Sequence, residues 1–243
     1  MSDALISKIS KVKKKLTGEM SINHQMTHLR NQNRLIYEQL ESYMSIINFL
    51  HPRYLLPPMR NSAISPDFAR ILIDEILTKK PKCVLECGSG VSTIINSYCI
   101  ELNNIGKIYS LDDDHKYAEI TRNNINKHLL NKYSEIYTAP LKQYSLNDKK
   151  YMWYDISSIK EIKDIDLLII DGPNGEKNPD ARFPALPLLY DKLSNNSTII
   201  IDDANRFGEK MMVDKWLEMY KDFEYSFFPT EKGTVILEKK QAN

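Results

Sequence analysis

Residues 83–93 read CVLECGSGVST, a short apolar run followed by a carboxylate, two closely spaced glycines and a helical pattern. Val84 and Leu85 are typical of a buried parallel strand. Gly88 and Gly90 allow the backbone to turn tightly and to approach a ligand closely. The stretch therefore predicts the strand, turn and helix that open a nucleotide-binding α/β fold.

The residues of this turn discriminate between ligands. A dinucleotide-binding turn has a third glycine where this chain has Thr93, and a P-loop has a lysine, which this turn lacks. Glu86 precedes the first glycine by two residues, where it would repel a pyrophosphate and attract an ammonium or sulfonium group. The turn thus favours S-adenosylmethionine over NAD or ATP, and an NAD-linked oxidoreductase is the weaker alternative.

A second acid follows where the next strand is expected to end. Residues 106–114 read GKIYSLDDD, and Asp112 lies 26 residues after Glu86. An acid at about this distance (roughly 20 residues or slightly more) sits at the tip of the second strand of a βαβ unit and can accept both ribose hydroxyls. Asp113 and Asp114 are better placed to open the next helix, where negative charge suits the helix dipole.

Size and composition limit the class of protein. The 243 residues (28.3 kDa) suffice for one α/β domain with a modest appendage. A formal net charge of +1 gives no general electrostatic reason to expect nucleic acid as a partner. Three cysteines predict reduced, buried thiols in a cytoplasmic protein. The sequence shows neither a signal peptide nor a membrane span of ~20 apolar residues.

The chain divides into a predicted N-terminal helical extension, residues 1–53, and an α/β domain, residues 54–243. Residues 1–20 combine apolar positions with several lysines. They are read either as a frayed, solvated terminus or as a segment that attaches to a partner or to the inner face of a membrane. Residues 21–51 have a longer helical pattern that could pack on the α/β domain or on another copy of the chain.

The α/β domain shows a regular alternation of apolar strands and helical segments. Because only a short connection, FPTEKG, joins the last two strands, they should form an antiparallel hairpin. We expect a Rossmann-like, doubly wound, mostly parallel seven-stranded sheet with this hairpin at its C-terminal end and helices linking the first five strands. The strands are predicted at 83–87, 107–111, 134–138, 165–171, 198–202, 223–228 and 233–238.

Acids also end the fourth and fifth predicted strands. Asp171 follows DIDLLII, and Asp202 and Asp203 follow STIII. These carboxylates should converge with Glu86 and Asp112 at one edge of the sheet, as a general base for a hydroxyl acceptor or as ligands for Mg²⁺. The structural alternatives are a turn-forming Asp171 before Gly-Pro and an Asp203 that caps the next helix.

Other side chains near the expected site have two readings. Arg60 and Arg206 could hold an anionic or sugar-like acceptor, or could be solvated charges or structural ion pairs. Tyr151, Trp153 and Tyr154 precede the fourth strand. Core packing is their first reading, and a lid that stacks on adenine or on a pyranose face is the second.

From about Leu55 to Leu237 the chain resembles the class I S-adenosylmethionine-dependent methyltransferases, within them the group called methyltransferase domain type 24, many of which occur with glycan or surface-polysaccharide genes. The motifs, in the group's order, are LPPMRNSAISPD, VLECGSGVST, IYSLDDDHKYAE, TAPL, WYD, DLLIIDGPNG, RFPALPLL and IIIDDANR. The Asp171 and Asp202–Asp203 pattern is similar to the metal-binding acids of catechol-type O-methyltransferases. It departs from them in the acid at 203, where they have asparagine, and in the Gly-Pro after Asp171.

The resemblance implies a set of site residues. Glu86, Gly88, Ser89 and Gly90 would line the methionine end of the cofactor, Asp112 its ribose and Ala139–Pro140–Leu141 its adenine, with Asp171 beside the methyl donor. Ser92, Thr93 and Asp113 complete the candidate cofactor-binding set. The candidate catalytic residues are Asp171, Asp202 and Arg206, and the candidate metal ligands are Asp171, Asp202 and Asp203.

These observations predict an O-methyltransferase that acts on a hydroxyl, on a small molecule or more specifically on a sugar or surface glycan. The alternative from another class is a noncatalytic cofactor-binding or scaffold subunit that docks a partner through its N-terminal helices. An assay of methyl transfer to candidate glycans separates the two.

Overall fold

The computed structural model describes residues 7, 22–175 and 180–240. Apart from Ser7, the basic segment predicted at residues 1–20 lies outside these ranges. The chain forms two units, Met1–Glu41 and Ser42–Asn243, and helix α2 (Ile22–Leu50) contributes to both. The domain boundary expected between residues 53 and 54 stays a prediction. Within the described ranges, no helix combines the length and the apolar character needed to cross a bilayer.

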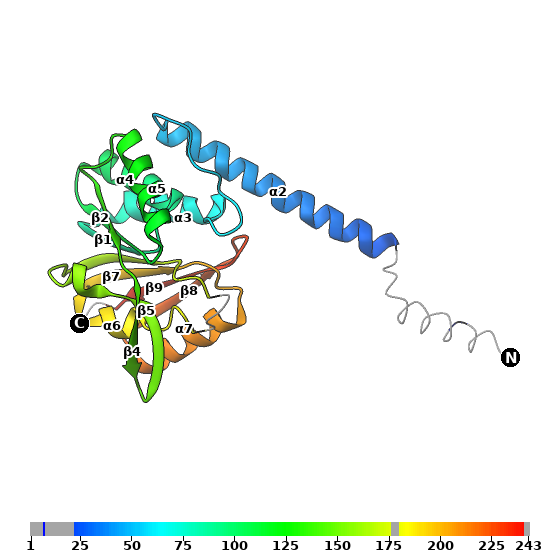
Figure 1. Ribbon diagram of the computed structural model, residues 1–243. Coiled ribbons are helices and arrows are strands. Elements are labelled where there is room, and N and C mark those ends of the chain that lie inside the picture. Colours follow the sequence, from blue (N-terminus) through cyan, green and yellow to red (C-terminus); the bar gives the residue numbers. More distant parts are fainter. Residues whose placement is uncertain (1–6, 8–21, 176–179, 241–243) are drawn as a thin grey trace. The chain divides into compact units, whose positions relative to one another are not determined.

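The larger unit contains one seven-stranded sheet with the order β3-β2-β1-β6-β7-β9-β8 (Figure 1). The strands from β3 to β7 in this order are parallel, and β9 is antiparallel to both of its neighbours. The predicted mostly parallel sheet with a C-terminal hairpin is therefore confirmed. The strands are β1 (Cys83–Cys87), β2 (Lys107–Asp112), β3 (Ser134–Thr138), β6 (Ile165–Ile170), β7 (Leu193–Ile201), β8 (Phe223–Phe228) and β9 (Thr234–Lys239).

Helices cover both faces of this sheet, because successive residues of each strand point to opposite faces. Val84 and Ile108 belong to the core on the side of α3 (Pro66–Lys79), α4 (Val91–Asn103) and α5 (His115–Lys127). Leu85 and Leu111, at an odd number of residues from Val84 and Ile108 along the same strands, belong to the core on the opposite side. That side carries α6 (Ala185–Leu189), α7 (Phe207–Met219) and the short 3-10 helices η1 (Ile156–Ile159) and η2 (Tyr190–Lys192).

One expected connection is wrong. Instead of a helix, the segment between β3 and β6 forms a separate antiparallel hairpin of β4 (Leu141–Leu146) and β5 (Lys149–Tyr154), followed by η1. Asn147 and Asp148 make its two-residue turn with φ values of 49° and 61°. This left-handed pair matches the twist of the flanking strands, and Asn and Asp adopt it more readily than most residues.

The strand order places the switch point of the sheet at β1. The chain leaves β1 toward β2 on one side, and β6 lies on the other side. In open α/β sheets, ligands bind outside the carboxyl ends of the strands at such a point. The fold therefore puts the β1–α4 turn, the end of β2 and the ends of β6 and β7 along one crevice.

Candidate active site

A cavity of about 720 Å³ opens at this edge of the sheet. This volume is in the range of small-molecule sites. It is bounded by the 57–64 connection, the β1–α4 turn, the loop after β2, helix α5 and the loops after β6 and β7. The residues that line it include Pro57, Pro58, Asn61, Gly88, Ser89, Gly90, Ser92, Asp112, Asp113, Tyr117, Ile120, Tyr154, Asp171, Asn174, Arg182, Asp203, Arg206 and Lys232.

The β1–α4 turn and the loop that packs against it each require a glycine, for different reasons. Gly88 has a φ of 116°, a conformation that side chains rarely adopt, and its amide donates to the carbonyl of Leu111 across 2.9 Å. Gly172, in the loop after β6, packs against this turn, and a Cβ there would clash with the hydroxyl of Tyr154. The turn is thus held between the ends of β2 and β6, and its backbone faces the cavity.

Glu86 lies beneath the turn rather than in the cavity. It is 1% exposed, and its Oε2 accepts hydrogen bonds from Thr93 Oγ1 (2.6 Å) and Ser110 Oγ (2.7 Å). The Thr93 hydroxyl in turn accepts from the Gly90 amide across 3.2 Å. Burial raises the pKa of Glu86 to about 7, against the lowering effect of its hydroxyl neighbours. The geometry therefore makes Glu86 and Thr93 supports of the turn.

Asp112 reaches the cavity from the end of β2. Its Oδ2 accepts from Ser89 Oγ across 2.5 Å, and its Oδ1 accepts from the Asp114 amide across 3.0 Å. Ser89 Oγ also lies 3.0 Å from Thr121 Oγ1. Burial raises the pKa of Asp112, opposed by these hydrogen bonds. The carboxylate is fixed in orientation and keeps unused lone pairs for hydroxyl donors.

The remaining candidate cofactor residues divide into two groups. Ser92 and the exposed Asp113 line the cavity, and Asp114 caps α5 by accepting from the amides of Lys116 and Tyr117. Ala139–Pro140–Leu141 follow β3 and, among the described residues, do not line the cavity. The Ala139 amide instead donates to the Asp112 carbonyl across 2.7 Å, so this segment lies directly behind the acid.

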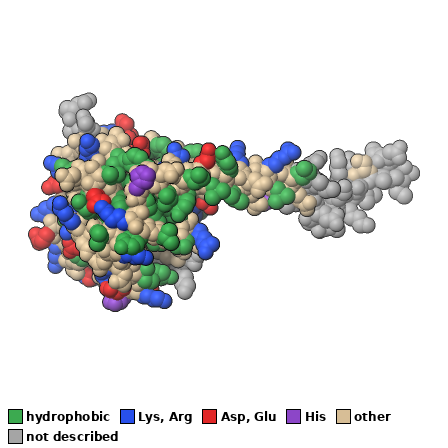
Figure 2. All heavy atoms as spheres, turned by 90° about the horizontal axis from the view of Figure 1, so that it is seen from above, with side chains coloured by type: hydrophobic (Ala, Val, Ile, Leu, Met, Phe, Trp, Pro, Cys, Tyr) green, Lys and Arg blue, Asp and Glu red, His purple; other side chains and the backbone are tan. Residues whose placement is uncertain are grey.

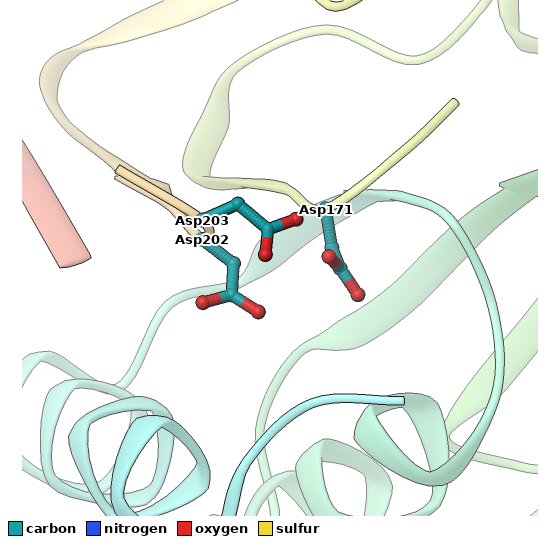
Figure 3. Close-up of side chains that lie close together, drawn as sticks. All are labelled: Asp171, Asp202 and Asp203. Atoms are coloured by element: carbon teal, nitrogen blue, oxygen red, sulfur yellow. The ribbon is translucent and has the colours of Figure 1, made fainter. Parts of the chain in front are cut away.

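The three aspartates predicted at the ends of β6 and β7 do converge (Figure 3). Carboxylate oxygens of Asp171, Asp202 and Asp203 all lie within 4.8 Å of one another. Asp171 and Asp203 line the cavity, whereas Asp202 is fully buried behind them. Burial, followed by repulsion from the other two carboxylates, raises the pKa of Asp202. Asp202 therefore has no direct access to a bound acceptor.

Arg182, a residue that the sequence analysis did not single out, lies within this cluster. Its side chain is 4% exposed. Nη2 donates to Asp203 Oδ2 (2.7 Å), to the Asp171 carbonyl and, more weakly, to Asp171 Oδ1 (3.4 Å), and Nη1 donates to the Asp202 carbonyl (3.0 Å). Burial by itself would lower the pKa of Arg182, but the carboxylates of Asp171 and Asp203 raise it by more, so the pKa lies above its ordinary value. One guanidinium thus connects all three strand-end residues.

Two further cations complete the cluster. Lys232, in the β8–β9 connection, donates to the Ala63 carbonyl across 2.8 Å and lies 3.8 Å from Asp202 Oδ2. Arg206, half exposed at the mouth, lies 2.9 Å from Asp203 Oδ2. The side chain of Asp203 therefore accepts from arginines and does not cap α7, whose N-cap is Arg206 without a side-chain cap bond.

The three aspartates have features for and against binding a divalent ion. Both carboxylate oxygens of Asp202 and the Oδ1 of Asp203 are buried without a hydrogen-bond partner, which would suit an oxygen-preferring cation. However, each of these acids already has a cationic neighbour: Arg182 contacts both Asp171 and Asp203, Arg206 contacts Asp203, and Lys232 lies near Asp202. Both arginines also lie 3.9 Å from the buried Glu209. The occupied oxygens of Asp171 and Asp203 do not fit an ion held by all three aspartates, and Mg²⁺ stays a prediction.

The structure also places Arg60 and the aromatic residues before β6. Among the described residues, Arg60 is exposed and does not line the cavity. Tyr151, Trp153 and Tyr154 are buried in the core, as their first reading held, and Trp153 stacks edge to face on Tyr154 with ring centroids 5.5 Å apart. Tyr154 also lines the cavity, so this core reaches the site.

Residues 85–204 match the model of a protein family described as a methyltransferase domain. The chain carries a methyltransferase domain. The family resemblance stated from the sequence is thereby confirmed. The matched range runs from β1 to the loop after β7 and contains Glu86, Asp112, Asp171, Asp202 and Asp203, whereas the basic residues Arg206 and Lys232 follow it. No curated protein sequence matches the chain.

Solved structures similar to this methyltransferase domain agree in fold. An SAH-bound methyltransferase from Podospora anserina has a TM-score of 0.61 at 16% identity, over 92% of this chain and 99% of that chain. A methyltransferase from Geobacter sulfurreducens has a TM-score of 0.58 at 16% identity, over 83% and 89%. An O-methyltransferase from Bacillus cereus in complex with SAH has a TM-score of 0.55 at 17% identity, over 82% and 91%.

Proposed function

We propose that the chain transfers the methyl group of S-adenosylmethionine to a hydroxyl oxygen. The observation that carries the proposal is the single cavity in which the β1–α4 glycine turn, Asp112 and Asp171 meet. The description of the Bacillus cereus protein as an O-methyltransferase in complex with SAH supports the same cofactor and reaction. SAH is S-adenosylhomocysteine, the product that remains after methyl transfer.

The residues of the cavity fit this cofactor. The backbone of Gly88–Gly90 gives close access at the methionine end, and the oriented Asp112 carboxylate can accept both ribose hydroxyls. Tyr117 and Ile120 of α5 add apolar surface that suits a purine ring. When bound, S-adenosylmethionine supplies a methyl group on a positively charged sulfur, and the carboxylates that line the cavity favour that charge.

Asp171 is the proposed general base. Its side chain is 19% exposed and lines the cavity, and burial raises the pKa of its carboxyl, although Arg182 opposes this. A carboxylate with a raised pKa accepts a hydroxyl proton more readily. Asp202, whose side chain is buried behind the cavity, is proposed as a positioning residue: its carboxylate lies 3.8 Å from Lys232 Nζ, and its backbone carbonyl accepts from Arg182.

The proposed acceptor is a sugar or glycan hydroxyl, on a small molecule or a surface polysaccharide. The mouth offers polar side chains that suit several hydroxyl groups, among them Asn61, Asn174 and Arg206. Arg206 is half exposed there, so that an acceptor can reach its guanidinium. The motif resemblance to a group found with glycan genes supports the same acceptor class.

The test is methyl transfer from labelled S-adenosylmethionine to a panel of monosaccharides, oligosaccharides, a catechol and a carboxylic acid. The proposal predicts label in a base-stable methyl ether of a sugar. Label only in a base-labile methyl ester, or only in the catechol, would contradict the acceptor class. Tight binding of SAH without transfer to any acceptor would support the noncatalytic alternative instead.

A further inference from the structure

Helix α2 carries a continuous heptad seam. The spacing alternates between three and four residues, as in the a and d positions of a coiled coil. Asn33 occupies an a position, and the same alternation extends in the sequence to Ile22 and Leu50. The seam residues, as the term is used below, are Met26, Leu29, Asn33, Ile36, Leu40 and Tyr43.

The apolar residues of this seam are exposed. Leu29 is 55% exposed, Ile36 58% and Leu40 55%, and hydrophobic side chains are visible on the surface of α2 in Figure 2. A helix in a protein draws most of its stability from burying such a face. The exposed seam therefore predicts a binding partner that covers it.

Asn33 indicates what the partner is. A single asparagine at an a position specifies register and a two-stranded state, because it pairs with the same asparagine of a parallel partner. In an antiparallel pair it would face an apolar d residue, and its amide would lack a partner. The asparagine thus favours a second, parallel copy of the same helix.

The residues that flank the seam allow self-pairing. In a parallel pair the g residues of one helix face the e residues of the other. Three g positions are glutamines, Gln25, Gln32 and Gln39, and of the e positions opposite them only Arg30 is charged. Like charges therefore do not oppose one another across a pair of identical helices.

An anionic membrane suits this helix less well. Helices that lie on anionic lipid are rich in lysine and arginine on the polar face. In the range Ile22–Leu50, Arg30 and Arg34 are balanced by Glu38 and Glu41, so the helix has no net charge apart from histidine. Burial of the seam against protein is the better match.

We propose that α2 pairs with α2 of a second copy of this chain as a parallel two-stranded coiled coil through the seam residues. The pairing buries Leu29, Ile36 and Leu40 against their counterparts and sets Asn33 beside the partner's Asn33. The proposal does not depend on methyl transfer.

The first experiment measures the mass of the full chain by sedimentation equilibrium. We expect a dimer for the wild type. Ile36→Asp buries a charge in the seam and should raise the dimer dissociation constant roughly a hundredfold or more. Leu35→Asp is the matched control, because Leu35 is exposed (42%) one position outside the seam and should leave the dimer intact. A monomeric wild type, or equal effects of the two substitutions, would overturn the proposal.

The second experiment tests direction and register. Leu40→Cys at an a position should form an intermolecular disulfide on mild oxidation, whereas Glu38→Cys on the outer face should not. Equal cross-linking of both, or of neither while the chain is dimeric, would overturn the parallel arrangement.

A third experiment measures sedimentation of the full chain with vesicles of anionic phospholipid. If Ile36→Asp abolishes this sedimentation and leaves the mass of the chain unchanged, the seam is a membrane surface and the proposal is wrong.

Discussion

Arg182 donates to Asp203 across 2.7 Å, and both side chains are 4% exposed, so the pair forms a buried part of the cavity wall. The same guanidinium holds the Asp171 and Asp202 carbonyls. Because it bonds backbone carbonyls at the ends of both β6 and β7, Arg182 fixes these strand ends relative to each other. Removal of Arg182 would also leave the buried Asp203 as an uncompensated charge. It is the element of the site on which the stability of the acid cluster depends.

Replacement of Arg182 should therefore destabilise the protein. Arg182→Met should lower the free energy of unfolding by about 3 to 5 kcal/mol, the usual cost of breaking a buried ion pair. Arg206→Met is the control, because Arg206 contacts the same Asp203 oxygen but is half exposed, and it should cost about 1 kcal/mol or less. Urea denaturation followed by circular dichroism measures both, and equal losses would contradict the structural role of Arg182.

Methyl transfer should not depend on a divalent ion. Arg182, Arg206 and Lys232 already form ion pairs with the three aspartates, which leaves Asp171 and Asp203 with occupied oxygens. We expect the rate in excess EDTA to equal the untreated rate within a factor of about two, while a metal used as a Lewis acid would supply several kcal/mol. Loss of activity with EDTA and its recovery with Mg²⁺ or Mn²⁺ would show that the alternative reading of these acids, as metal ligands, is correct.

Asp171 should control the chemical step. Asp171→Asn should lower kcat by roughly 10² to 10⁴, the usual contribution of a general base, and leave the affinity for SAH nearly unchanged. Asp214→Asn, on the exposed side of α7, is the control and should retain the wild-type rate. Because burial raises the pKa of Asp171, activity should fall as the pH drops through that raised value. A rate that is independent of pH in the acidic range, or an active Asp171→Asn, would argue against this role.

Glu86 should give the unliganded protein a specific pH dependence. Its pKa of about 7 in the folded chain exceeds the ordinary value of 4.5, so between these values the folded state binds more protons than the unfolded state. Stability due to this group is therefore present below about pH 4.5 and is lost as the pH rises through about 7. The loss amounts to about 3 kcal/mol. Denaturation of wild type and Glu86→Gln at pH 5 and pH 8 tests this, and parallel pH profiles would contradict it.

The positions of the strands along the chain and the glycine turn could be predicted because the signals are local. The periodicity of residues 83–93 and 106–114 is enough to place β1, β2 and the acid at the end of β2. The β4–β5 hairpin was missed, although the Asn147–Asp148 pair is a turn signal, because its strands carry charged side chains that hide the alternation.

The part of the site that could not be predicted depends on register and on long-range pairing. Glu86 was expected to face the ligand, but its side chain lies beneath the turn, where Ser110 of β2 and Thr93 of α4 donate to it. Arg182 lies in the irregular segment after β6, and only the assembled sheet brings it to the acids. Its sequence signal, in retrospect, is an arginine between Asp171 and the Asp202–Asp203 pair, strand-end aspartates that need a counter-charge.

Calorimetric titration with SAH tests the central claim most directly, because it requires no knowledge of the acceptor. We predict that the wild-type chain binds SAH in the cavity and that Asp112→Ala weakens binding by roughly ten- to a hundredfold, the effect of one charge-assisted hydrogen bond of about 1.5 to 3 kcal/mol. Asp214→Asn should bind like the wild type. Absence of binding to the wild type, or wild-type affinity in Asp112→Ala, would contradict the assignment of this cavity to S-adenosylmethionine.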